Sequence, residues 1–163
     1  NANAHPKHNT FEWSIKAGIS VADYARKRRF PMTVHADPTG MAPPRGPLTW
    51  DALMQYTARL DARQDAGLGD VLSAGGFRQF VAVMVSFPDE TLITPLIGLS
   101  NSGARVLVVV PDPATFPGKG GIDGTRFVDT LVAEGVDAVR LPYGDDWAAT
   151  LTTHVRPNPV GLR

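Results

Sequence analysis

The sequence predicts an α/β fold, a Rossmann-like parallel sheet with helices on both faces. Helix-like and strand-like segments alternate along the chain, which favours parallel strands joined by right-handed crossovers. Two segments, FVAVMVS (80–86) and RVLVVV (105–110), are continuous apolar runs apart from Ser86 and Arg105, rather than alternating. Strands that are buried on both faces have this pattern. We therefore expect these two strands to be central, adjacent and parallel.

Length and composition restrict the function classes. The 163 residues predict one domain that buries roughly two thirds of its unfolded surface. Sixteen basic residues balance sixteen acidic ones, so neither nucleic acid nor a membrane is expected as a partner. The chain has no cysteine, which excludes disulfides and thiolate catalysis. No apolar run approaches the roughly 20 residues of a membrane-spanning helix. We expect a soluble, cytoplasmic fragment, whose full-length protein could still carry a membrane anchor.

The first element is expected to be a helix over residues 10–29. Asn9, with Glu12 three residues later, forms a capping box at its start. The RKRR run at 26–29 suits the carboxyl end of the helix dipole. A phosphate-binding patch is the weaker alternative, because no aromatic residue interleaves with these charges. The residues that recur at helical spacing and mark the buried stripe are Phe11, Ile15, Gly18, Ala22 and Ala25.

Turn-forming residues separate the later elements. PMTVHA (31–36) is short and partly β-branched, which predicts a strand followed by a proline-rich loop. Thr49 is expected to cap a helix that reaches Arg63. Gly103 and Gly135 are expected to stop two further helices. The other expected elements are a helical turn at 69–75, a strand at 80–86, a helix at 90–102, a strand at 105–110, a helix at 125–134, a strand at 137–143 and a helix at 145–154.

The predicted order begins with a helix, although in folds of this class the first helix almost always follows a strand. The preferred explanation is a truncated domain, whose central strand lies upstream in a larger protein. The alternative is a four-stranded sheet that begins with a helix. We assign residues 1–9 to a polar lead with a cloning remnant, 10–155 to the α/β domain and 156–163 to a flexible tail.

Three segments carry a resemblance to a known family: NTFEWSIKAGISVADYARKRRFPMTVHAD (9–37), GGFRQFVAVMVSFPDETLITPLIGLSNSGARVLVVVPDPATFPG (75–118) and EGVDAVRLPYGDDWAATL (134–151). They resemble the C-terminal part of the bacterial domain-of-unknown-function family numbered fifty-eight, over residues 10–151. The resemblance implies a von Willebrand factor A-like fold without its first strand. It also implies a protein-interaction module, since relatives are often encoded beside MoxR-type AAA ATPases and are thought to work with them.

Acidic residues follow the expected strands, at the edge where open parallel sheets bind ligands. In von Willebrand factor A domains a D-x-S-x-S loop holds Mg²⁺, and this chain lacks that loop. Ser86 and Asp89 come nearest to the family's fourth-strand position. Asp37, Asp89 and Asp112 are weak candidates for a Mg²⁺ site, but capping of turns and helices is the preferred interpretation. No metal or other cofactor is therefore expected. The remaining acidic candidates at this edge are Asp145 and Asp146.

Motifs of a catalytic site are missing from the sequence. There is no G-x-S-x-G elbow, the four histidines have no metal-ligand spacing, and GKGG (118–121) matches neither phosphate-binding consensus. A non-catalytic protein-interaction domain is therefore the preferred function. The alternative is a Mg²⁺-dependent enzyme or small-molecule binder that uses the acidic strand ends.

The interaction surface is expected at the carboxyl end of the sheet, where the SFPD turn (86–89) and two long proline-containing loops meet. These loops carry apolar and cationic residues of the kind that interfaces use, namely Met41, Arg45, Phe116 and Lys119. Self-association is expected as well. A missing upstream strand would leave a central strand with unpaired backbone groups, which favour pairing with another chain.

Overall fold

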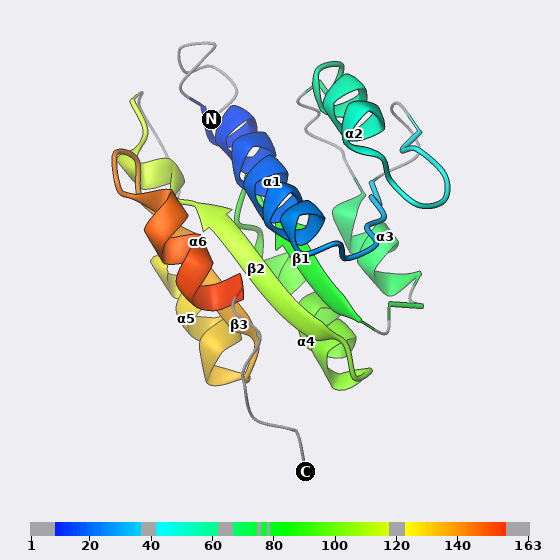
Figure 1. The fold of residues 1–163 in the computed structure, drawn as a ribbon. Helices are drawn as coiled ribbons and strands as arrows, with labels where there is room; N and C mark the ends of the chain where they lie inside the picture. Colours follow the sequence, from blue (N-terminus) through cyan, green and yellow to red (C-terminus); the bar gives the residue numbers. More distant parts are fainter. Residues whose placement is uncertain are drawn as a thin grey trace.

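A computed structural model describes residues 9–36, 42–61, 67–74, 76–77, 79–117 and 123–155. These residues form an α/β domain with a three-stranded parallel sheet and helices on both faces (Figure 1). No helix in this part of the chain is long and apolar enough to cross a membrane. In chain order the elements are α1 (Thr10–Lys27), α2 (Trp50–Thr57), α3 (Leu68–Ser73), β1 (Phe80–Met84), η1 (Glu90–Leu92), α4 (Ile93–Asn101), β2 (Arg105–Pro111), η2 (Pro113–Thr115), α5 (Thr125–Ala133), β3 (Asp137–Leu141) and α6 (Trp147–Val155).

The sheet has the order β1-β2-β3, with all strands parallel. Val83 lies beside Val108, and Val109 lies beside Val139. The prediction that FVAVMVS and RVLVVV are adjacent and parallel is confirmed, as is the central place of RVLVVV. The prediction of a central FVAVMVS is wrong, because β1 lies at the edge of the sheet and Phe80 is 41% exposed. A strand that is apolar at every position indicates that helices cover both of its faces. It does not indicate that another strand pairs with each of its edges.

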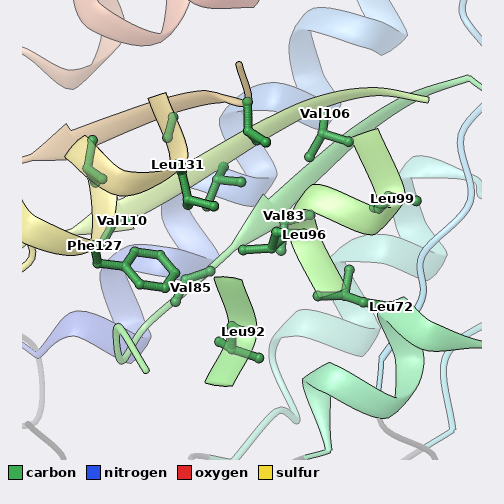
Figure 2. Packing of buried hydrophobic residues seen from close by; sticks show 14 of the residues in the cluster. Leu72, Val83, Val85, Leu92, Leu96, Leu99, Val106, Val110, Phe127 and Leu131 are labelled. Atoms are coloured by element: carbon green, nitrogen blue, oxygen red, sulfur yellow. The ribbon is translucent and has the colours of Figure 1, made fainter. Parts of the chain in front are cut away.

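Each face of the sheet is covered by its own apolar cluster. On one face, β1 and β2 pack against α4 and α5, with Val108, Leu96 and Leu131 fully buried. Figure 2 shows Val83, Leu96 and Leu131 converging there. On the other face, β2 and β3 pack against α1 and α6. The alternating side chains of β2 therefore enter both clusters, which is why its sequence is apolar at every position from 106 to 110.

The predicted strand at 31–36 is not formed. This segment pairs with no strand among the described residues. The Leu48 N–H donates to its Met32 carbonyl at 2.8 Å. The side chains of 31–36 alternate between exposed and half-buried. A strand also needs a backbone partner, which the pattern of one segment cannot reveal. The described sheet has three strands rather than the four expected.

The predicted helix starts are confirmed by side-chain caps. The Glu12 N–H donates to Asn9 Oδ1 at 2.8 Å, and the Ala52 N–H donates to Thr49 Oγ1 at 3.2 Å. The helix opened by Thr49 ends at Thr57, well before the expected Arg63. Directly beyond its end Arg59 and Asp61 are exposed and Leu60 is half-buried.

Two glycines of one helix are expected to respond in opposite directions to alanine. Gly103 follows α4 with a φ of +94°, where an alanine is strained although no atom lies within 4 Å of its Cβ. We expect Gly103→Ala to lower the free energy of unfolding by about 1 kcal/mol. Gly98 lies within α4, where an added Cβ would also meet open space, and Gly98→Ala should raise stability by up to about 1 kcal/mol. Urea unfolding of both variants measures this; equal effects would contradict it.

Candidate functional site

The three strands deliver their following turns to one edge of the sheet. The SFPD turn follows β1, Asp112 follows β2, and the turn at 142–146 follows β3 (Figure 1). The predicted candidates Asp37, Met41 and Lys119 lie outside the described residues. The other residues of this edge make up the candidate site.

Asp112 is the most buried acidic residue of this edge, with 1% exposure. Its Oδ1 accepts hydrogen bonds from the Ala114 N–H at 3.2 Å and from the Gly124 N–H at 3.3 Å. Its Oδ2 accepts from Arg140 Nη1 at 3.0 Å. Burial of a carboxylate is costly unless it is paired and hydrogen-bonded. Asp112 meets both conditions within the protein, so it joins the end of β2 to η2, α5 and β3.

Arg140 organises this network from β3. Its Nη1 also donates to Thr125 Oγ1 at 2.7 Å and lies 3.8 Å from Asp123 Oδ1. The Thr125 hydroxyl and backbone N–H in turn donate to Asp123 Oδ1. Arg140, Asp123 and Thr125 are not among the site residues that the sequence predicts. One signal was available, because Arg140 is the one cation in the otherwise mostly apolar strand DAVRL.

The other acidic candidates act mainly as caps. Asp89 is exposed, and its Oδ1 accepts from the Thr91 N–H at 2.9 Å at the start of η1. Asp146 Oδ1 accepts from the Ala149 N–H at 3.1 Å at the start of α6. With Asp112 at the start of η2, the preferred capping interpretation is confirmed for three residues. Asp145 is exposed, and its backbone carbonyl accepts from the Trp147 N–H.

Phe116 lies in an aromatic cluster beneath the start of α1. Its ring is 3% exposed and lies 5.9 Å from Trp13 and 5.1 Å from Tyr143, centroid to centroid. Trp147 completes the cluster at 4.3 Å from Trp13, and its Nε1 donates to the Pro142 carbonyl at 2.8 Å. Phe116 is therefore part of the core in this structure. It does not provide the exposed apolar contact that was expected from the sequence.

Exposed groups at this edge gather at the SFPD turn and the start of α5. Phe87 has 53% of its surface exposed, whereas the neighbouring Pro88 is buried. Glu90 and Arg126 form an exposed ion pair at 3.6 Å. Ser86 is half-buried, and Arg45, on the loop before α2, is exposed. The turn thus presents one large apolar side chain, with charged groups on the elements that follow it.

The described residues form an open groove but no cluster of metal-ligating side chains. They contain no group of three or more His, Cys, Asp or Glu residues that could hold a metal ion. An open groove of about 440 Å³ lies between α1 and α6 and reaches Trp50. The acidic residue on its wall, Asp23, lies 2.7 Å from both Arg26 and Lys27. These charges are therefore satisfied within the protein.

The pKa of Asp123 is lowered from its ordinary value of 3.8, chiefly by the hydrogen bond from the Thr125 hydroxyl, then by the Thr125 N–H and the charge of Arg140. A lowered folded-state pKa contributes stability above the unfolded value, and the contribution is lost as the pH falls through the folded value. We expect Asp123→Asn to be less stable than wild type at neutral pH. The difference should shrink as the pH falls below 3.8 and through the lowered pKa of Asp123. Urea unfolding at neutral and at acidic pH tests this, and a pH-independent difference would contradict it.

Comparisons of the chain with protein-family models, with curated proteins and with solved structures found no match. The fold itself is an α/β domain with a three-stranded parallel sheet, consistent with a Rossmann-like architecture.

Proposed function

We propose that this chain is a non-catalytic protein-interaction domain that binds its partner through the SFPD turn at the carboxyl end of β1. The exposed ring of Phe87 is the observation that carries this proposal. Large aromatic side chains anchor protein interfaces, and a polar rim commonly surrounds them. Here Glu90 and Arg126 supply charged groups nearby in the fold.

The local structure suits such an anchor. Pro88 is buried and restrains the backbone directly after Phe87, and Asp89 caps η1 through the Thr91 N–H. A turn that is held in one conformation loses little conformational entropy when it docks, so more of the contact energy contributes to affinity. The exposed ring is therefore presented on a supported turn.

The acidic residues support a non-catalytic role. The Asp112 carboxylate accepts hydrogen bonds from two backbone N–H groups and from Arg140. Asp89 and Asp146 each accept a hydrogen bond from one backbone N–H group. A general base or nucleophile needs geometry that engages a substrate. These contacts instead hold the turns of the sheet edge in place.

For the partner, we propose a MoxR-type AAA ATPase of bacteria, on the basis of the family resemblance given above. The test measures binding of the purified chain to a purified MoxR-type ATPase by surface plasmon resonance. Phe87→Ala should weaken binding about 10-fold or more, because loss of an anchor aromatic costs about 2 kcal/mol. Phe30→Ala is a matched control, because Phe30 is also 53% exposed. Phe30 follows the carboxyl end of α1, at the end of the sheet opposite to the SFPD turn.

The control variant should bind within about 2-fold of wild type, a difference of about 0.4 kcal/mol. Wild-type affinity in the Phe87 variant would overturn the assignment of the SFPD turn. Lack of binding by the wild-type chain would overturn the choice of partner.

A further inference from the structure

The open groove between α1 and α6 has apolar walls (Figure 1). The apolar residues of the two helices that line it are Ile19, Val21, Ala148 and Leu151. Two hydroxyls also line it, and both are satisfied within their own helices. Ser20 Oγ donates to the Lys16 carbonyl at 2.9 Å, and Thr152 Oγ1 donates to the Ala148 carbonyl at 2.6 Å. The groove therefore offers apolar contact area between the helices.

Two arginines at the end of α1 are stacked on aromatic rings that line this groove, those of Tyr24 and Trp50. The guanidinium carbon of Arg26 lies 4.9 Å from the centroid of the Trp50 ring, and that of Arg28 lies 5.0 Å from the centroid of the Tyr24 ring. A guanidinium that stacks on a ring keeps N–H donors at its edge for an anion. The run RKRR contains no aromatic residue, but the fold places two beside it.

Positive charges exceed negative ones at this end of the groove. Asp23 lies 2.7 Å from both Arg26 and Lys27, so one carboxylate faces two cations. Arg28 and Arg29 are exposed, and neither forms an ion pair with an acidic side chain in the described part of the chain. An anionic group that docks here therefore meets cations without acidic partners.

The other two helices around the groove do not cancel this charge. α6 contributes WAATLTTHV, in which His154 is the one titratable side chain. α2 contributes Trp50, which is followed by the exposed Asp51. One further carboxylate still leaves an excess of positive charge at the end of α1. The groove thus combines apolar walls with a cationic end.

We propose that this groove binds an acidic segment of a partner protein. Apolar side chains of the segment contact α1 and α6, and its carboxylates contact the cations at the end of α1. Grooves between helices commonly bind amphipathic segments in this way, and complementary charge steers such partners and disfavours cationic ones. The groove lies on a helical face of the sheet. The proposal is therefore independent of the proposed function, which rests on Phe87 at the carboxyl edge.

Three synthetic peptides test the chemistry of the occupant. The probe is a fluorescein-labelled peptide with leucine and glutamate at helical spacing, and two companions carry lysine for glutamate or serine for leucine. Fluorescence anisotropy with the 163-residue chain should show binding of the probe at about 10 to 100 µM and at least about 10-fold weaker binding of both companions. Binding of the probe should weaken at about 0.5 M salt, because salt screens charge pairs at a surface.

Two neighbouring alanines of α6 provide matched variants. Ala148 and Ala149 are both exposed, but only Ala148 lines the groove. Ala148→Glu places a carboxylate in the groove and should weaken binding of the probe about 10-fold. Ala149→Glu adds the same charge to the same helix turn and should bind the probe within about 2-fold of wild type. Both substitutions put an acid in the first turn of a helix, which favours folding.

Arg29 separates loss of binding from loss of folding. Its φ of +59° is one that glycine adopts without strain. Arg29→Gly should therefore raise the midpoint of urea unfolding while it weakens binding of the probe about 3-fold.

The proposal would be overturned if the glutamate peptide bound no tighter than the lysine peptide, or if Ala148→Glu bound it as wild type does. Two further results would identify a different occupant and overturn it as well. One is a wild-type dimer in sedimentation velocity that Ala148→Glu abolishes. The other is sedimentation with phosphatidylserine vesicles by a chain that does not bind the probe.

Discussion

Replacement of Asp112 by alanine is expected to lower the free energy of unfolding by about 3 kcal/mol. The substitution leaves the Gly124 N–H and the guanidinium of Arg140 without their carboxylate partner. Loss of one member of a buried pair costs about 3–5 kcal/mol, and the 39% exposure of the Arg140 side chain places the effect at the lower end. Urea unfolding followed by circular dichroism measures the difference.

Two controls separate the network from a general effect of removing charge. Asp145→Ala removes an exposed carboxylate at the same edge of the sheet and should change stability by less than about 0.5 kcal/mol. Asp112→Asn keeps an oxygen that can accept the two backbone N–H groups, so we expect an intermediate loss. Equal stability of the Asp112→Ala and Asp145→Ala variants would show that the buried network does not hold this edge.

Leu131→Ala is expected to cost about 2–5 kcal/mol of stability. Leu131 has 0% exposure and projects from α5 into the cluster formed with β1, β2 and α4 (Figure 2). Truncation removes buried methyl groups and leaves a cavity that close-packed neighbours fill only in part. Thermal and urea unfolding measure the loss.

The neighbouring Val132 provides the control for Leu131, because it lies on the same helix and is 54% exposed. Val132→Ala should change stability by no more than about 0.5 kcal/mol. A small effect of Leu131→Ala, similar to that of Val132→Ala, would contradict the packing of α5 on the sheet.

Local patterns predicted most of the fold. The two-faced apolar run of β2, the caps at Asn9 and Thr49, and the glycine at the end of α4 depend on residues close in sequence. Such signals can be recognised without knowledge of the rest of the chain. The alternation of helices and strands then restricts the topology to parallel strands.

The errors concern contacts between distant residues. Whether 31–36 becomes a strand, and whether β1 has neighbours on both sides, depends on the presence of another strand. The Asp112 to Arg140 bond joins residues 28 positions apart, which a local pattern cannot show. Phe116 illustrates the same limit, because a loop position favours exposure, while the rings of Trp13 and Tyr143 bury it.

Calorimetric titration of the chain with Mg²⁺ and with Mn²⁺ tests most directly whether the acidic residues of the sheet edge hold turns rather than a cation. Asp112 is fully engaged by protein donors, and Asp89 caps η1, whereas these cations need a fixed shell of oxygen ligands. We predict no binding in the micromolar range. Micromolar affinity that disappears in Asp89→Ala would contradict a non-catalytic interaction domain and would favour a complete metal site.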